Sequence, residues 1–391
     1  MLTFKYSMTG RSQAKPNHRA VAARLLAVGP GAGVGGHPGV PGHGRNGGAV
    51  RAARRALSWR MPRPVLEVAL AAALLATSGA AGARAQTAPV ELRRGDRIVL
   101  VGNTLAERMQ LYNHFETLLA TRLPDLRLTV RNLAWSADTI TLQPRPLNFG
   151  ATPTHLYRQK ADVIFAFFGL NESFDGQAGL AAFERDLDGY LRGHLAATYN
   201  GATPPRLVLV SPIAHEPLAR LPHVDVEARN RELARYTEAM RQVAAAAGVG
   251  FMDLFAPTRR AMASAPAPLT INGIHLNEAG DLLVARLLLD ALGLSAGLRP
   301  AAAGDVGRLE ALRETIRDKN QQFFYRFRPV NAEYVVGRRV EPFGAVNFPG
   351  EMAQLDALVA QRDRRIWDRA RALAGIGYPP DAAAAARPGT R

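Results

Sequence analysis

Residues 97–110, RIVLVGNTLAERMQ, join a short apolar run to a glycine turn that opens a helix-like segment. The run Arg97–Gly102 is typical of a buried strand. A tight turn between a strand and a helix projects its side chains into the crevice above a sheet, where nucleophiles are often found. Asn103 and Thr104 are the polar residues at this turn. This stretch therefore indicates an α/β domain with a candidate site at the end of its first strand.

From about residue 95 the chain alternates short apolar runs with amphipathic segments. The predicted strands are Arg97–Gly102, Leu126–Asn132, Ala161–Gly169, Arg206–Ser211 and Val249–Leu254. The clearest predicted helices are Ala106–Arg122, Leu180–Ala197, Glu227–Ala247 and Glu278–Leu292. Nearly continuous apolar strands that alternate with helices predict a parallel sheet covered on both faces. We expect a three-layer α/β/α sandwich with a five-stranded parallel sheet over residues 92–295.

Polar residues follow four of the predicted strands, and a fifth polar segment directly precedes the last predicted helix. They are Asn103 and Thr104, the segment Trp135–Thr139, Asn171 and Glu172, His215 and Glu216, and Asn272 to Asn277. Ligands of parallel sheets bind beyond the carboxyl ends of the strands. Any one of these segments could be a helix cap or a turn, but the five together predict a shared crevice.

The net charge of +16 is unevenly distributed along the chain. Residues 1–60 carry +10 of it and contain no Asp or Glu, and the rest is spread over residues 61–391 without a basic stripe. This distribution argues against a nucleic-acid partner. Residues 1–60 also hold the low-complexity stretch GPGAGVGGHPGVPGHGRNGG (29–48), which cannot bury enough apolar surface to fold. We expect a disordered arm or sequence upstream of the true start.

A secretory signal pattern begins at Met61. MPRPVLEVALAAALLATSGAAGARAQ has a basic start, a short apolar stretch and Ala83-Arg84-Ala85 before Gln86. The apolar stretch is too short to span a membrane. Residues 61–85 are therefore predicted to direct export to the periplasm or the medium, with no stable membrane span after their removal. The chain has no cysteine, which excludes disulfides, thiolate catalysis and cysteine-ligated metals.

Four short blocks in the polar segments resemble the SGNH or GDSL-type esterases and lipases. The Gly-Asp-Ser block corresponds to Gly102-Asn103-Thr104, and the block with the oxyanion glycine corresponds to Trp135–Thr139. Gly-x-Asn-Asp corresponds to Gly169-Leu-Asn-Glu172, and Asp-x-x-His to Asn272-Gly-Ile-His275. The blocks occur in the family's order, each after the appropriate strand. The resemblance implies a flavodoxin-like strand order.

The resemblance also implies residue roles, and three of the residues that take these roles, Thr104, Ala137 and Asn272, depart from the family pattern. Thr104 occupies the position of the nucleophilic serine, and His275 occupies the position of the general base. Asn272 occupies the position of the aspartate that orients the histidine. Ala137 occupies the position of the oxyanion glycine and can still donate its backbone N–H to the oxyanion. Asn171 is the asparagine whose side chain supplies the second donor in the family. The amide oxygen of Asn272 could accept from the imidazole, but it adds no charge to stabilise the imidazolium. Substitution of serine by threonine crowds the attacking hydroxyl with a methyl group.

Other chemistry in the same crevice stays open. Glu107, Glu172, His215 and Glu216 are further candidates, since a carboxylate with a histidine could activate water directly. No HExxH or similar ligand spacing occurs, so neither a metal nor a cofactor is predicted. The alternative for Glu107 is a favourable charge in the first turn of a helix. Glu172 and Glu216 could instead be buried hydrogen-bond partners, and His155, His194 and His223 are predicted to lie on the surface.

Beyond the sheet domain we predict a helical extension over residues 304–375 and a disordered tail over 376–391. Helices are expected at Asp305–Gln322 and Met352–Leu373. The aromatic and arginine cluster FFYRFRP (323–329) is expected to pack onto the domain, with stacking on sugars as the alternative. The predicted function is that of an exported hydrolase acting on small-molecule or carbohydrate esters, including acetyl esters. The alternative is a silent binding module for a glycan or a protein, and the sequence makes no prediction of oligomeric state.

Overall fold

The computed structural model describes residues 90–342 and 344–380. The predicted arm (1–60), the predicted signal peptide (61–85) and residues 381–391 of the predicted tail lie outside the described residues. Among the helices that are described, none has both the length and the apolar composition needed to cross a membrane.

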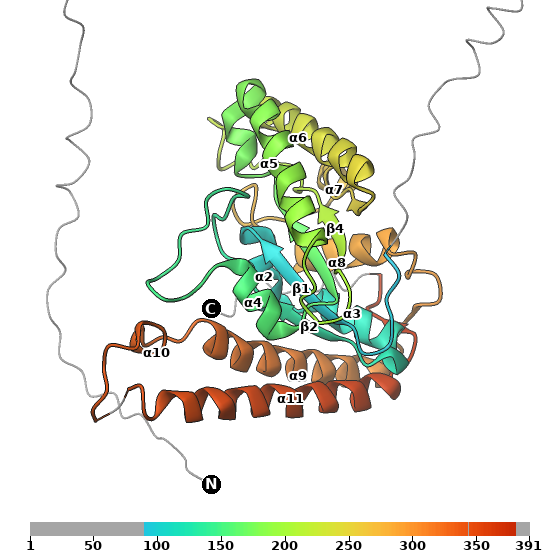
Figure 1. The fold of residues 1–391 in the computed structure, drawn as a ribbon. Helices are drawn as coiled ribbons and strands as arrows, with labels where there is room; N and C mark the ends of the chain where they lie inside the picture. The colour runs from blue at the N-terminus through green and yellow to red at the C-terminus, as the bar shows by residue number, and fades with distance from the viewer. Residues whose placement is uncertain (1–89, 343, 381–391) are drawn as a thin grey trace, which may run out of the picture. The chain divides into compact units, whose positions relative to one another are not determined.

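A five-stranded parallel sheet forms the centre of the domain (Figure 1). The strands β1 to β5 are Arg97–Gly102, Thr129–Asn132, Val163–Phe167, Arg206–Val210 and Gly250–Met252. Their spatial order is β2-β1-β3-β4-β5, which is the flavodoxin-like order. The predicted parallel sheet and its order are confirmed. β2 begins three residues later than predicted, because Pro124–Leu126 forms a 3-10 turn.

Alternate residues of β1 contribute to two separate hydrophobic cores, one on each face of the sheet. Ile98 and Leu100 belong to one core, and Val99 and Val101 belong to the other, as the two-residue period of a strand requires. The first face is covered by α2 (Thr104–Tyr112), α3 (His114–Arg122), α7 (Phe255–Ser264) and α8 (Glu278–Ala291). The second is covered by α4 (Thr152–Gln159), α5 (Gly176–Leu195) and α6 (Val226–Ala247). The three-layer prediction is confirmed.

The predicted helix Ala106–Arg122 is in fact two helices, α2 and α3, that meet at Asn113. Asn113 has φ 65°, in the left-handed region, and its N–H donates to the Met109 carbonyl oxygen at 2.8 Å. Asparagine tolerates this conformation because its short side chain bonds locally; here Asn113 Nδ2 donates to the Gln110 carbonyl oxygen. The break was not predicted, since the apolar pattern continues across it.

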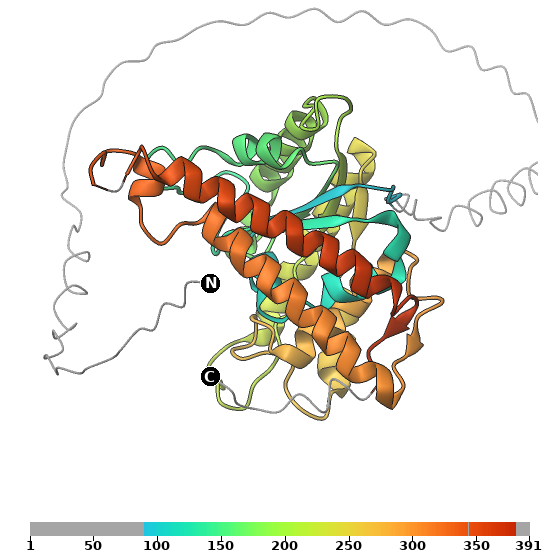
Figure 2. The ribbon, with the colours of Figure 1, turned by 90° about the horizontal axis from the view of Figure 1, so that it is seen from below.

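The extension consists mainly of two long antiparallel helices that lie side by side, α9 (Ala303–Phe327) and α11 (Phe348–Arg371) (Figures 1 and 2). The short helix α10 (Glu333–Val336) lies between them in the chain. Both long helices pack against α3, and α9 also contacts the edge strand β2. Strands β6 (Arg299–Pro300) and β7 (Ile376–Gly377) pair in parallel, so residues 376–380 belong to the fold, beyond the predicted end of the extension at 375.

Buried polar contacts join the extension to the sheet domain. Lys319 of α9 is fully buried, and its Nζ lies 2.8 Å from Glu116 Oε1 of α3. The same Nζ donates to the Val130 carbonyl oxygen of β2 at 2.9 Å. Trp367 Nε1 of α11 donates to the Leu128 carbonyl oxygen at 2.8 Å. These contacts cover β2, the edge strand of the sheet, which would otherwise be open to pairing with other chains.

Two histidines that were predicted on the surface are buried. His155 Nε2 lies 3.0 Å from the Phe149 carbonyl oxygen, and His194 Nδ1 lies 2.6 Å from the Tyr199 hydroxyl. Burial lowers the pKa of each imidazole to about 4. The prediction was wrong because single histidines carry no local signal of burial; His223 is exposed as predicted.

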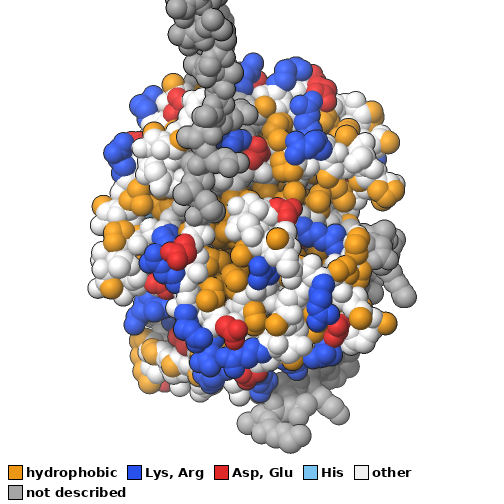
Figure 3. Space-filling view, turned by 90° about the vertical axis from the view of Figure 1, so that its right-hand side faces the viewer, with side chains coloured by type: hydrophobic (Ala, Val, Ile, Leu, Met, Phe, Trp, Pro, Cys, Tyr) orange, Lys and Arg blue, Asp and Glu red, His pale blue; other side chains and the backbone are white. Residues whose placement is uncertain are grey.

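On the face shown in Figure 3, Lys and Arg side chains form several separate groups with Asp and Glu among them.

Candidate active site

The turn between β1 and α2 places Thr104 as the first residue of a helix. Gly102 has φ 114°, and a Cβ there would lie 2.1 Å from the Phe167 carbonyl oxygen, so only glycine fits. Asn103 is buried, and its Oδ1 accepts from the Leu105 N–H at 3.1 Å. Asn103 is therefore the helix N-cap, whereas Thr104 is half-buried and faces a cleft.

This cleft, called the Thr104 cleft below, has a volume of about 430 Å³. One face of α2 forms one wall, because residues three, four and seven positions apart share a helix face. His275 enters the cleft from the loop before α8, and α9 contributes the remaining wall. The lining residues are Thr104, Glu107, Arg108, Gln110, Leu111, Ser136, His275, Arg317, Asn320, Gln321 and Phe324. No hydrogen bond joins Thr104 to His275 in the described part of the chain.

The Ala137 N–H donates to Thr104 Oγ1 at 3.2 Å. Ala137 has φ 66°, a left-handed conformation that costs a non-glycine residue roughly 1–2 kcal/mol. The backbone therefore keeps the shape that a glycine would adopt more easily. Asn171 lies close by, since its Nδ2 donates to the carbonyl oxygen of Asp138, the residue after Ala137, at 2.9 Å. The structure thus brings Thr104, Ala137 and Asn171 together.

Asn272 contacts His275 in the orientation opposite to the expected one. Its Oδ1 accepts from the backbone N–H of His275 at 2.9 Å and of Ile274 at 3.4 Å. Its Nδ2 lies 3.1 Å from Nδ1 of the imidazole. Two N–H donors at the oxygen decide which way the amide points, so the NH₂ group faces the ring. The expectation that the amide oxygen accepts from the imidazole was wrong because the backbone already occupies that oxygen.

This contact determines the tautomer of His275. An NH₂ group can only donate, so Nδ1 must accept, and the neutral ring carries its proton on Nε2. Burial, followed by the positive charge of Arg108, lowers the pKa of His275. The imidazole is therefore neutral at pH 7, but its proton is on the nitrogen that a general base needs free.

Glu172 and Glu216 hold loops rather than face the cleft. Glu172 accepts from the N–H of Gly169 at 2.8 Å and of Ile140 at 3.1 Å, and burial raises the pKa of its carboxyl. Glu216 is buried and accepts from the N–H of Leu269 at 2.8 Å. Both are the hydrogen-bond partners that the sequence analysis named as the alternative.

His215 also lies outside the Thr104 cleft. Its backbone N–H donates to Asn230 Oδ1 at 2.8 Å, and Nε2 of its ring would lie 2.5 Å from a Cβ at Gly273. His215 therefore packs against Gly273 of the loop that carries His275.

Arg328, at the end of α9, reaches the site from the extension. It pairs with Glu107 and donates to the Ala134 carbonyl oxygen. Its guanidinium carbon lies 3.8 Å from the ring centre of Trp135. Glu107 also accepts from the Ser136 hydroxyl, so these contacts tie α2 to the loop that carries Ala137. Phe323 and Phe327 of the aromatic cluster are buried as predicted, whereas Tyr325 is exposed and Phe324 lines the Thr104 cleft. The role of Arg328 was missed, because contacts this distant in sequence leave no local signal.

We expect Arg328→Ala to lower the free energy of unfolding by about 2 kcal/mol, the range for hydrogen bonds to charged groups that are shielded from water. Urea denaturation of the full chain measures this. The matched control is Arg326→Ala, which removes an exposed pair with Asp356 and should cost less than about 1 kcal/mol. Equal losses for the two variants would contradict a special role for Arg328.

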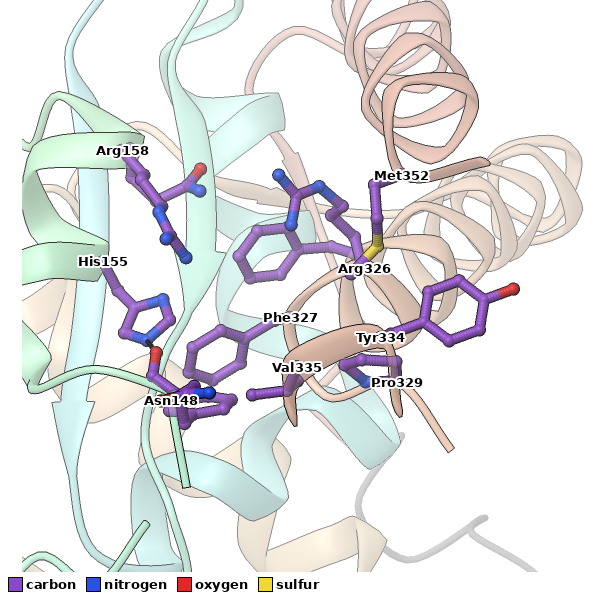
Figure 4. A pocket seen from close by; sticks show the side chains of 12 residues that line it. Asn148, His155, Arg158, Arg326, Phe327, Pro329, Tyr334, Val335 and Met352 are labelled. Carbon is purple, nitrogen blue, oxygen red and sulfur yellow. Dashed lines mark hydrogen bonds between the residues drawn. The ribbon is translucent and has the colours of Figure 1, made fainter. Parts of the chain in front are cut away.

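A second cavity, of about 310 Å³, lies between α4 and the extension (Figure 4). Its walls include His155, Arg158, Phe327, Tyr334 and Val335. None of the predicted site residues lines it, so the Thr104 cleft remains the candidate active site. Among the described residues, no group of three or more His, Asp or Glu side chains is arranged to hold a metal ion.

The strand order and the helices on both faces of the sheet define a three-layer α/β/α fold. Residues 95–283 match the model of the GDSL-like lipase/acylhydrolase family. The sheet domain therefore belongs to that family, as the four blocks indicated. A search of the curated proteins found no match.

Three solved structures are similar to this chain over about half its length. A GDSL-like lipase from Parabacteroides merdae is 16% identical with a TM-score of 0.42, and the match covers 53% of this chain and 100% of that one. An acetylxylan esterase from Geobacillus stearothermophilus is 17% identical with a TM-score of 0.40, covering 52% of this chain and 97% of that one. A gut microbial diltiazem-metabolizing enzyme is 20% identical with a TM-score of 0.42, covering 53% of this chain and 49% of that one.

Proposed function

We propose that this protein hydrolyses carboxylic esters with Thr104 as the nucleophile. The observation that carries the proposal is the 3.2 Å hydrogen bond from the Ala137 N–H to Thr104 Oγ1, in a cleft that His275 also lines. An N–H that already lies at the attacking oxygen is within reach of the oxyanion that forms two bonds away from it. Because Thr104 Oγ1 accepts this bond, its own O–H remains available to a base.

The proposed reaction proceeds through an acyl-enzyme. Thr104 Oγ1 attacks the carbonyl carbon, and its proton passes to His275 Nε2. The oxyanion accepts from the Ala137 N–H and from the second N–H of the Asn171 amide. Collapse expels the alcohol, which takes the proton from His275, and water then releases the acid by the same steps.

The orientation of Asn272 makes this reaction slow. His275 can accept the proton at Nε2 only after its own proton moves to Nδ1, where it would face the Asn272 NH₂ group. In the serine-protease triad the corresponding Asp→Asn change costs about 10⁴ in kcat for this reason.

We propose carbohydrate esters, including acetyl esters, as the substrate class. The lining of the cleft supports this, since Gln110 and Gln321 offer amide groups and Phe324 offers a ring, a combination that suits hydroxyl groups and sugar faces. We also propose that the protein is exported, on the basis of the signal pattern at residues 61–85.

A second candidate function is a binding module without turnover. The observation that favours it is again the Asn272 amide, which holds His275 in the tautomer that cannot act as a base. A silent module would keep the cleft for a glycan and lose the chemistry.

Turnover of p-nitrophenyl acetate tests the proposal. We expect Thr104→Ala to abolish the activity of the full chain, and Thr104→Ser to retain or raise it, because serine keeps the hydroxyl without the crowding methyl group. If Thr104→Ala keeps full turnover, Thr104 is not the nucleophile, and water activated by His275 becomes the better mechanism. Thermal stabilisation by a glycan panel without any turnover would favour the binding module.

A further inference from the structure

The Thr104 cleft contains an arginine without an acidic partner. Arg108 pairs with no Asp or Glu within the described residues, and its closest polar contact is Nη2 to the Leu276 carbonyl oxygen at 3.5 Å. Its Nε is buried without any partner. A guanidinium offers five donors and is not deprotonated in proteins. Most of the hydrogen-bonding capacity of Arg108 is therefore not used by other groups of the protein.

The charges around Arg108 leave the cleft positive. Glu107, the acidic residue of the lining, is neutralised by Arg328. Arg317 also lines the cleft and pairs at 2.6 Å with the exposed Glu314. Asp281 lies near Arg108, but burial raises the pKa of its carboxyl to about 8, so it is mostly protonated at pH 7.

Arg108 lies one helical turn after Thr104 on the same face of α2. Residues four apart on a helix have Cβ atoms roughly 5–6 Å apart. A group bound by Arg108 would therefore lie only a few bonds from a carbonyl carbon held at Thr104. Arginine matches the planar geometry of a carboxylate by paired hydrogen bonds.

We propose that the substrate is an anionic ester, with a carboxylate within a few bonds of the scissile carbonyl, and that Arg108 binds this carboxylate. Within the carbohydrate esters of the proposed function, this class is acetylated uronic-acid sugars. The inference rests on the proposed function for its catalytic part, whereas carboxylate binding can be tested without turnover.

The test compares two sugars that differ only in a carboxylate, acetylated methyl glucuronoside and acetylated methyl glucoside. For the unmodified full chain we expect kcat/KM to be at least about tenfold higher for the glucuronoside, the contribution of one charge-assisted interaction. Arg108→Gln should bring this ratio close to one, and Arg108→Lys should give an intermediate value, since lysine keeps the charge but loses the fork. The matched control, Arg260→Gln, removes an exposed arginine of α7 and should leave the ratio unchanged.

The same variants separate this inference from the proposed esterase activity. If neither ester is hydrolysed, thermal stabilisation is measured with methyl glucuronoside and with methyl glucoside. Stabilisation by the glucuronoside alone, lost in Arg108→Gln, supports the inference although the esterase proposal fails. A ratio of one or less in the unmodified chain overturns it, as does a ratio that Arg108→Gln leaves unchanged. Absence of both turnover and carboxylate-dependent stabilisation also overturns it.

Discussion

Asn272→Asp is expected to raise the kcat for p-nitrophenyl acetate by about 10³, most of the factor that the reverse change costs in the serine-protease triad. One carboxylate oxygen would accept the backbone N–H groups of Ile274 and His275, as the amide oxygen does now. The other oxygen would accept from Nδ1–H, in place of the NH₂ group that now donates to Nδ1. The proton of the neutral imidazole then moves to Nδ1, and Nε2 becomes free to act as the base.

The same substitution should shift the acid limb of the pH–rate profile. Burial and Arg108 now hold the pKa of His275 below its usual range. A carboxylate at position 272 favours the imidazolium and raises that pKa, so the acid limb should move to higher pH. A gain in kcat without this shift would mean that the substitution acts by another route.

Thr104→Ala in the Asn272→Asp background is the control for the nucleophile. We expect it to remove the gained activity, which also excludes a contaminating esterase. A gain that survives Thr104→Ala would identify water activated by His275 as the nucleophile, and no gain in either background would favour the binding module.

Lys319→Met is expected to lower the free energy of unfolding by about 3–5 kcal/mol, the usual cost of removing one partner of a buried ion pair. The substitution leaves the negative charge of Glu116 on α3 without its positive partner. The Val130 carbonyl oxygen also loses the hydrogen bond that Lys319 donates. The loss is large because an unpaired charge shielded from water is far costlier than an exposed one. Urea denaturation of the full chain measures it.

Two variants make the Lys319 result specific. Lys160→Met replaces an exposed lysine at the end of α4 and should change the stability by less than about 0.5 kcal/mol. The double variant Lys319→Met/Glu116→Leu removes both charges and should recover part of the loss. A double variant less stable than Lys319→Met alone would show that packing around these side chains, rather than the ion pair, stabilises the contact between the extension and the sheet domain.

Much of the site could be predicted because it depends on local sequence. Gly102, Asn103 and Thr104 form a turn whose shape follows from a glycine, a capping asparagine and the strand and helix on either side. The polar segments follow the strands, and parallel strands bring their carboxyl ends to one edge, so Ala137 and Asn171 could be expected near Thr104. The sequence could not decide between the two possible roles of Glu172 and Glu216. A buried carboxylate that accepts hydrogen bonds from a loop and a carboxylate that takes part in the reaction give the same local sequence pattern.

The sequence by itself determined the three-layer α/β/α fold and the edge of the sheet that carries the site, since apolar periodicity and turn residues act over short distances. The strand order followed from the resemblance of the four blocks to a known family. Only the tertiary structure decided what completes that site. The wall formed by α9, the Arg328–Glu107 pair and the buried Lys319–Glu116 pair each join residues about two hundred positions apart. The direction of the Asn272 amide is a local effect by contrast, because its oxygen accepts from backbone N–H groups two and three residues further along the chain.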